Sequence, residues 1–245
     1  MKKDKIDLVK SRITYETFKD MASDKELSKY EKIGFPNDYR EKYEESIFNN
    51  INTILRLDRE EIIFFDVGCG CSELPKLIIK NAIKNRQNLY MIDSEEMLVH
   101  LPNKDNMVKI SGKFPDEINL LEYQNKVDAI VLYSVLQHIV LDMNPFYFID
   151  EAVKLLNDGG RLLIGDIPNI SKRNRFFASN TGLKFHQNFT KTNTNPKYEF
   201  NTLIEDKIDD SLVFAILSRY RNAGFETYLL EQQIDLPMRN RREDI

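Results

Sequence analysis

The segment Asp66–Ser72 contains residue types that are suited to holding a small ligand. It begins within the end of the apolar run Ile62–Val67 and contains Gly68 and Gly70. Glycines in a turn between a strand and a helix let the backbone approach a ligand closely, because no Cβ is in the way. Asp93 stands 23 residues beyond Gly70, at the end of another apolar run. An ionised carboxylate there can accept hydrogen bonds from both hydroxyls of a ribose.

The acidic residues around this turn favour a ligand without phosphate groups. A dinucleotide-binding turn has a third small residue three positions after its second glycine, and this chain has Glu73 there. A carboxylate at that place repels a pyrophosphate, whereas Asp66 suits a cationic amino-acid group. S-Adenosylmethionine carries a ribose, a sulfonium and an amino group but no phosphate. The turn therefore predicts this cofactor rather than a dinucleotide.

Alternating strand and helix patterns must position the turn. Amphipathic helices are expected over Leu74–Ile83 and Ile149–Leu156. Apolar runs predict strands at Ile62–Val67, Leu89–Ile92, Met107–Ile110, Val127–Tyr133 and Arg161–Asp166. Continuous apolar strands separated by such helices indicate an α/β, Rossmann-like, doubly wound and mostly parallel sheet that is covered on both faces.

The two ends of the chain differ from this central pattern. Residues 1–60 predict an N-terminal helical cap, because apolar residues from Tyr43 to Leu55 recur at helical spacing. Residues 61–245 form the expected Rossmann-like domain, with an insertion at about 167–200 that is either a lid or a mobile loop. A helix near Asp210–Ala223 and a strand pair, Glu226–Leu230 with Ile234–Pro237, are expected to complete the chain.

Composition restricts the class of partner. The 245 residues have a formal net charge of −4, which argues against broad attraction to nucleic acid or to an anionic membrane. No apolar run is long enough to span a bilayer, and no secretory signal follows the charged N-terminus, so a cytoplasmic location is expected. The two cysteines, Cys69 and Cys71, are expected to be free thiols.

Four segments resemble the motifs of class I S-adenosylmethionine-dependent methyltransferases. Phe65–Gly70 resembles motif I, and Tyr90–Ser94 is similar to the second motif. Val127–His138 resembles motif IV and Leu156–Ile164 the strand-five motif, in the family's order over Ile62–Asp166. The resemblance implies a seven-stranded sheet whose last strand is antiparallel.

The resemblance also implies which residues contact the cofactor. Asp66 and the glycine backbone would face the methionine moiety, Asp93 would hold the ribose, and the turn after the third strand would border the adenine. That turn, Ser111–Lys113, lacks the acid that many members use for the adenine amine. The implied cofactor residues are Asp66, Gly68, Cys69, Gly70, Asp93, Ser94, Gly112, Lys113, Phe114, Tyr133 and Ser134.

A narrower resemblance concerns the acceptor. Gly165–Asn169 and Leu236–Asp244 are similar to bacterial methyltransferases of surface-polysaccharide pathways, including those of methyl phosphoramidate capsule decoration. It implies O-methylation of a sugar, phosphate or phosphoramidate intermediate of capsule biosynthesis.

Three residues are candidates for catalysis. His138 follows the fourth strand, Asp166 ends the fifth, and His186 lies in the insertion between Phe185 and Phe189. The alternatives are a histidine that hydrogen-bonds under a loop, an acid paired with Lys172 or Arg173, and an exposed loop histidine.

The insertion begins with a basic cluster that suits a phosphorylated small-molecule acceptor, because guanidinium groups match phosphate oxygens. The alternative is a solvated charged face. The candidate substrate-binding residues are Lys172, Arg173 and Arg175.

Other functions remain open from the sequence. A non-catalytic adenosylmethionine-binding sensor or assembly partner would carry the same turn, and an NAD-dependent oxidoreductase is a third interpretation. Nucleic-acid bases are disfavoured as acceptors, because Tyr133-Ser134-Val135 lacks the Asn/Asp-Pro-Pro-aromatic pattern of adenine amino methyltransferases. A metal is not expected, because no acid ends the fourth strand beside Asp166.

Overall fold

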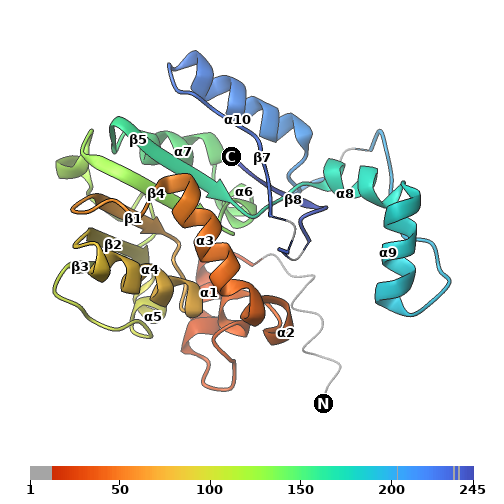
Figure 1. The fold of residues 1–245 in the computed structure, drawn as a ribbon, viewed down its shortest axis with the longest axis horizontal. Coiled ribbons are helices and arrows are strands. Elements are labelled where there is room, and N and C mark those ends of the chain that lie inside the picture. Colours follow the sequence, from red (N-terminus) through yellow and green to blue (C-terminus); the bar gives the residue numbers. More distant parts are fainter. Residues whose placement is uncertain (1–12, 203, 234, 237) are drawn as a thin grey trace. The chain divides into compact units, whose positions relative to one another are not determined.

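The structure is a computed structural model that describes residues 13–202, 204–233, 235–236 and 238–245 (Figure 1). The chain divides into two compact units, Met1–Ile164 and Gly165–Ile245. The first unit contains the N-terminal helices together with the large sheet, and the expected boundary between residues 60 and 61 stays a prediction.

A five-stranded sheet forms the centre of the first unit, with the strand order β3-β2-β1-β4-β5 (Figure 1). Strand β1 pairs in parallel with both β2 and β4, and β2 pairs in parallel with β3. This arrangement confirms the α/β, Rossmann-like class. The strands are β1 (Ile63–Val67), β2 (Asn88–Asp93), β3 (Met107–Ser111), β4 (Val127–Tyr133) and β5 (Leu156–Gly165).

The register of the strands brings the glycine turn and Asp93 to one edge of the sheet. Val67 is aligned with Ile92, and the backbone N–H of Gly68 donates to the Ile92 carbonyl at 2.8 Å. Since the neighbouring strands are parallel, the segments that follow β1, β2 and β4 all emerge at their carboxyl ends. This edge is where α/β sheets bind ligands.

Helices flank the large sheet within the first unit (Figure 1). Helix α3 buries Ile47, Ile51 and Leu55, as their spacing predicts. Helix α1 begins with a capping box, in which the Thr14 hydroxyl accepts from the backbone N–H of Thr17. The helices are α1 (Tyr15–Ser23), α2 (Asn37–Arg40), α3 (Glu44–Leu55), α4 (Glu73–Lys84), α5 (Glu95–Leu98), α6 (Leu136–Asp142) and α7 (Pro145–Val153).

The C-terminal unit has its own small antiparallel sheet, with the order β6-β8-β7. The expected seven-stranded sheet is therefore wrong in its strand number, because β8 pairs with β6 and β7 in this second sheet and not with the large sheet. The elements are β6 (Ile167–Pro168), α8 (Ile170–Phe177), α9 (Asn180–Thr190), α10 (Asp210–Asn222), β7 (Leu230–Glu231) and β8 (Arg242–Asp244).

The last strand also lies later than expected. Ile234 and Pro237 are outside the described residues, and Asp235 and Leu236 between them form a turn and a bend. Strand β7 pairs instead with β8, where Leu230 is aligned with Asp244.

Much of the segment 167–200 is helical rather than an irregular loop. Helices α8 and α9 pack closely at Gly182, where a Cβ would stand 1.9 Å from the Phe176 carbonyl oxygen. Asn169 and Ser179 cap the two helices through their side-chain oxygens. Among the described residues, no helix is long and apolar enough to cross a membrane.

Candidate functional site

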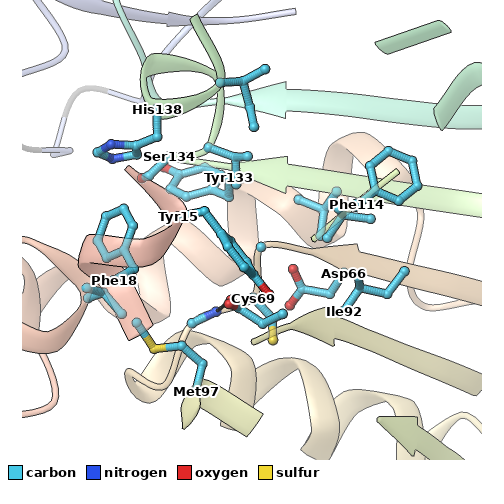
Figure 2. A pocket seen from close by; sticks show the side chains of 18 of the residues that line it. Tyr15, Phe18, Asp66, Cys69, Ile92, Met97, Phe114, Tyr133, Ser134 and His138 are labelled. Carbon is cyan, nitrogen blue, oxygen red and sulfur yellow. Dashed lines mark hydrogen bonds between the residues drawn. The ribbon is translucent and has the colours of Figure 1, made fainter. Parts of the chain in front are cut away.

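A cavity opens at the carboxyl ends of β1, β2 and β4 in the first unit (Figure 2). Its empty space is about 1060 Å³, a volume that includes open solvent at its mouth. Every implied cofactor residue except Ser94 lines it. Residues from α1, α2 and α6 complete the wall.

The glycine turn has the backbone conformation that only glycine adopts easily. Gly68 has a φ of +73° and Gly70 a φ of +64°. A Cβ on Gly68 would lie 2.6 Å from Val135 Cγ2, and a Cβ on Gly70 would lie 2.8 Å from Ile33 Cγ2. Both the turn geometry and the neighbouring side chains therefore require glycine at these two positions.

Asp93 is fixed beside the turn by two backbone hydrogen bonds. Its Oδ2 accepts from the Gly70 N–H at 2.8 Å, and its Oδ1 accepts from the Ser94 N–H at 2.7 Å. Burial raises the pKa of Asp93 to about 6, although these two donors act in the opposite direction. A carboxylate has about four lone-pair positions, so Asp93 keeps acceptor capacity for two further donors.

Asp66 is a buried carboxyl group without a hydrogen bond or ion pair in the described part of the chain. Burial, and then the nearby charge of Asp93, raise the pKa of Asp66 to about 8. Burying a carboxyl group that has no partner costs free energy, and a cation bound beside it would offset that cost. The cavity therefore has two acidic groups on one side and favours a ligand with a positive charge.

Ser94 and the two cysteines have local roles. The Ser94 hydroxyl accepts from the Met97 N–H at 3.2 Å and so caps α5, and Ser94 does not line the cavity. Both cysteines are free. Burial raises the pKa of Cys69 well above its ordinary value and that of Cys71 to about 11, so both remain protonated thiols at neutral pH.

The segment after β4 contacts an arginine that the sequence analysis missed. Arg40 donates from Nη1 to the Ser134 hydroxyl at 3.1 Å, and its guanidinium carbon lies 5.3 Å from the centre of the Tyr133 ring. Arg40 is buried, pairs with Glu44 at 3.1 Å and lines the cavity. Its only sequence signal was a basic residue four positions before an acid at a helix start, a common pattern on exposed helices.

Another part of the wall is more apolar. The Phe114 and Phe148 rings meet edge to face, with centroids 5.1 Å apart. Lys113 Nζ lies 3.7 Å from Asp142 Oδ2, and the Gly112 N–H donates to the Asp93 carbonyl at 3.1 Å. The chain after β3 is thereby tied to the end of β2.

Helix α1 supplies two aromatic residues, Tyr15 and Phe18, that the sequence analysis did not single out. Figure 2 shows Tyr15 directed into the cavity. The Tyr15 backbone N–H donates to Asp142 Oδ2 at 3.0 Å. Burial, and then the charge of Asp93, raise the pKa of the Tyr15 phenol. No cofactor motif contained these residues, because they reach the site through tertiary packing.

His138 lines the same cavity and has a defined tautomer. Its Nδ1 lies 3.1 Å from the Ile13 carbonyl oxygen. A carbonyl oxygen only accepts, so Nδ1 carries the proton and the lone pair of the neutral ring is on Nε2. The ring packs edge to face on Phe18 at 4.7 Å. His138 therefore holds the N-terminal segment in addition to facing the cavity.

The other two candidates for catalysis belong to the C-terminal unit. Asp166 pairs with Arg242 at 2.7 Å and accepts from Gln232 at 3.4 Å, rather than pairing with Lys172 or Arg173. His186 contacts the Thr194 hydroxyl at 3.4 Å. Asp166 thus holds β8 through this ion pair. An acid paired with a basic residue was the structural alternative to a general base, although the expected partners were different.

The three basic residues proposed for the acceptor have different partners. Lys172 donates to the Arg242 carbonyl at 2.7 Å and lies 3.8 Å from Glu243 Oε2, and Arg175 pairs with Asp210. Arg173 donates to the neutral side-chain oxygen of Asn174 and to the Lys197 carbonyl. Within the described residues, no group of three His, Cys, Asp or Glu side chains could hold a metal ion.

Comparison with known proteins identifies the fold. No family model and no curated protein matches the chain. Among solved structures, the plantazolicin methyltransferase BpumL, bound to S-adenosylhomocysteine, superposes with a TM-score of 0.55 at 16% identity, covering 91% of this chain and 84% of that one.

Two further solved structures agree. A protein of Methanococcus maripaludis assigned as an S-adenosylmethionine-dependent methyltransferase gives a TM-score of 0.51 at 19% identity, over 96% of this chain and 94% of that one. A SAM-dependent methyltransferase from Aquifex aeolicus gives 0.50 at 17% identity, over 83% and 91%. The chain therefore has the fold of these methyltransferases.

Proposed function

We propose that this chain is an S-adenosylmethionine-dependent methyltransferase that acts on a small molecule in the cytoplasm. The observation that carries the proposal is the pair of buried acids at the glycine turn: the Asp66 carboxyl has no partner among the described residues, and Asp93 has acceptor capacity left. A ligand with a ribose and a positively charged amino-acid end matches both. A dinucleotide would bring its pyrophosphate to this acidic side.

The residues of the cavity suit the parts of this cofactor. Asp93 would accept hydrogen bonds from the ribose hydroxyls, and Asp66 would lie at the cationic methionine end. Arg40 is the cation suited to the methionine carboxylate, since guanidinium groups bind carboxylates through two hydrogen bonds. Phe114 and Phe148 offer an apolar wall to the adenine.

The bound cofactor would supply an activated methyl group, and the chain's own contribution would be chiefly positioning. Holding two reactants in line can contribute roughly 7–11 kcal/mol to lowering the barrier. His138 lines the cavity and is the candidate proton acceptor, a role that matters only when the acceptor atom must lose a proton. A base of this kind adds typically ~10²–10⁴ to the rate.

The finer proposal concerns the acceptor. We propose O-methylation of a sugar, phosphate or phosphoramidate intermediate of surface-polysaccharide biosynthesis, on the basis of the two short segments at Gly165–Asn169 and Leu236–Asp244. A non-catalytic adenosylmethionine-binding sensor is the second candidate. Asp166 is paired with Arg242, so the chain has one candidate general base fewer, and this observation favours the sensor.

Calorimetric titration with S-adenosylmethionine tests the cofactor assignment. We expect wild-type protein to bind it and to ignore NAD. Asp93→Ala should bind roughly ten- to a hundredfold more weakly, because it loses charge-assisted hydrogen bonds of ~1.5–3 kcal/mol. Asp105→Ala, at an exposed aspartate, is the matched control and should bind normally. Wild-type protein that ignores adenosylmethionine at millimolar concentration would contradict the proposal.

Transfer of a labelled methyl group to a small-molecule cell extract separates the enzyme from the sensor. The enzyme gives a labelled product with wild-type protein and much less with Asp93→Ala. Tight cofactor binding without any labelled product would favour the sensor.

A further inference from the structure

The two carboxyl groups at the glycine turn have opposite surroundings. Asp93 accepts hydrogen bonds from the backbone N–H groups of Gly70 and Ser94, at 2.8 and 2.7 Å. Asp66 is 4% exposed, lines the same cavity and accepts no hydrogen bond from the described residues (Figure 2). Donors to a carboxylate stabilise its charged form, whereas burial without a donor stabilises the protonated form. The two acids therefore favour different protonation states.

The charge of Asp93 increases this difference. Strands β1 and β2 are parallel neighbours, and Asp66 is aligned with Met91, two positions before Asp93. Two like charges in one buried site disfavour each other, so the acid with donors ionises first. Burial, and then the charge of Asp93, raise the pKa of Asp66 to about 8, while that of Asp93 is about 6. In the ligand-free protein at neutral pH, Asp66 thus holds a proton and Asp93 is ionised.

The fixed cations that line the cavity already face acidic partners. Arg40, from α2, pairs with Glu44 at 3.1 Å. Lys113, after β3, lies 3.7 Å from Asp142 Oδ2 on α6. The other ionisable groups of the lining are two phenols, a thiol and an imidazole: Tyr15 of α1, Cys69 of the glycine turn, Tyr133 of β4 and His138 of α6. Within the described residues, the Asp66 carboxyl has no ion pair, so a bound ligand must supply its cation.

We propose that the cofactor binds by exchanging its positive charge for the proton of Asp66. The cationic methionine end would lie beside Asp66 as a carboxylate, and the displaced proton would pass to the solvent. The O–H bond of the Asp66 carboxyl is the one bond that breaks, and one cation replaces one proton in the site. This inference rests on the proposed function, because it requires a cofactor with a cationic end.

The exchange makes cofactor affinity depend on pH with a definite sign. While ligand-free Asp66 is protonated, binding must release its proton, so affinity rises as the pH rises. One exchanged proton changes the apparent dissociation constant by at most about tenfold per pH unit. From pH 6.5 to 7.5 we expect the dissociation constant to fall roughly five- to tenfold.

Calorimetric titration of the full chain with S-adenosylhomocysteine, in two buffers that differ in heat of ionisation, counts the released protons. This ligand keeps the ammonium group, and at pH 7 we expect ~0.5–1 proton per ligand bound. 5′-Methylthioadenosine keeps the ribose and the adenine but lacks the amino-acid end, so it should bind with little proton release. Asp66→Asn should abolish the release and reduce the pH dependence to less than about twofold. Asp105→Asn, at an exposed aspartate, should retain both.

Several results would overturn the exchange and leave the proposed function intact. These are cofactor binding without proton release, and release that persists in folded Asp66→Asn. Equal release with 5′-methylthioadenosine would also overturn it, because the proton would then belong to the ribose side of the site. If Asp66→Asn fails to fold, as judged by circular dichroism, the two ligands compared on wild-type protein decide. Wild-type protein that binds neither S-adenosylmethionine nor S-adenosylhomocysteine would overturn the proposed function, and the exchange with it.

Discussion

The two buried acids beside the glycine turn make the ligand-free cavity sensitive to pH. An aspartate has a pKa near 3.9 in an unfolded chain. Burial raises the pKa of Asp66 to about 8 and that of Asp93 to about 6 in the folded protein. Between the unfolded pKa and these folded pKa values, the folded state holds more protons than the unfolded state. The free energy of unfolding therefore falls as the pH rises from about 4 to 8.

Replacing Asp66 by asparagine should remove the larger part of this dependence. At pH 8, ligand-free Asp66→Asn should be more stable than wild type by on the order of 1–3 kcal/mol, because the buried charge is absent. Near pH 3 the two proteins should be equal, since the wild-type carboxyl is then protonated in both the folded and the unfolded state. Urea unfolding at both pH values measures the difference, with Asp105→Asn as a control at an exposed aspartate. Equal stability at pH 8 would show that Asp66 is not a strained buried acid.

Among the candidate residues, those within a local motif were predictable from the sequence. Gly68, Gly70 and Asp93 follow apolar strands, and strand order alone brings them to one edge of the sheet. Arg40 was not predictable, because its contact with Ser134 joins residues 94 positions apart. The ion pair of Asp166 was not predictable for a related reason: its partner, Arg242, lies 76 positions later in the chain.

At the scale of elements, the pair Arg40–Glu44 connects α2 to the start of α3. Both side chains are almost completely buried, and Arg40 also reaches Ser134 at the end of β4. Removing one partner of a buried ion pair leaves an uncompensated charge, whereas replacing both by apolar residues is often nearly neutral. Burial already raises the pKa of Glu44, so its charged form depends on Arg40.

A double-mutant cycle separates the structural role of Arg40 from its proposed cofactor role. Arg40→Met should lower the free energy of unfolding by about 3–5 kcal/mol, and Arg40→Met with Glu44→Met should recover most of that loss. The double variant should still bind adenosylmethionine at least tenfold more weakly, because the cation proposed for the methionine carboxylate is absent. A stable double variant with wild-type affinity would restrict Arg40 to packing.

The hairpin of α8 and α9 depends on Gly182. In Gly182→Ala the new methyl group would stand 1.9 Å from the Phe176 carbonyl oxygen, so the two helices must separate. We expect a loss of stability of about 1–3 kcal/mol, as for other overpacked contacts. Urea unfolding measures it, and hydrogen exchange should increase in α8 and α9. Lys184→Ala, at an exposed position of α9, should change neither quantity. Unchanged stability and hydrogen exchange in Gly182→Ala would mean that the close crossing is absent in solution.

The elements of the first unit were predicted more closely than those of the second for a physical reason. Strand β4 is nearly all apolar and matches its expected bounds of Val127–Tyr133. Strands β6 and β7 have only two residues each, too few to show an alternating pattern. Helix α8 has five polar or charged residues in a row, Ser171–Arg175, and α9 mixes Asn and Thr with apolar residues, so their caps at Asn169 and Ser179 are the clearer signals.

At the scale of the whole molecule, the lining of the cavity lies entirely within the first unit, from Tyr15 to Phe148. A ligand that binds only the folded state stabilises the unit that holds it, by ≈2.7 kcal/mol at a hundred times its dissociation constant. Amides that exchange through unfolding of that unit should then exchange up to about a hundredfold more slowly.

Hydrogen exchange of the full chain with and without S-adenosylhomocysteine tests this localisation. We expect strong protection in peptides that contain the glycine turn, the end of β2 and the segment after β4, and in α1, whose Tyr15 lines the cavity. Peptides from α8, α9 and α10 should change little. Asp93→Ala at the same ligand concentration is the control and should lose most of the protection. Equal protection of both units would show that the ligand stabilises the chain as one cooperative body, and that the division at residue 164 is not a boundary in stability.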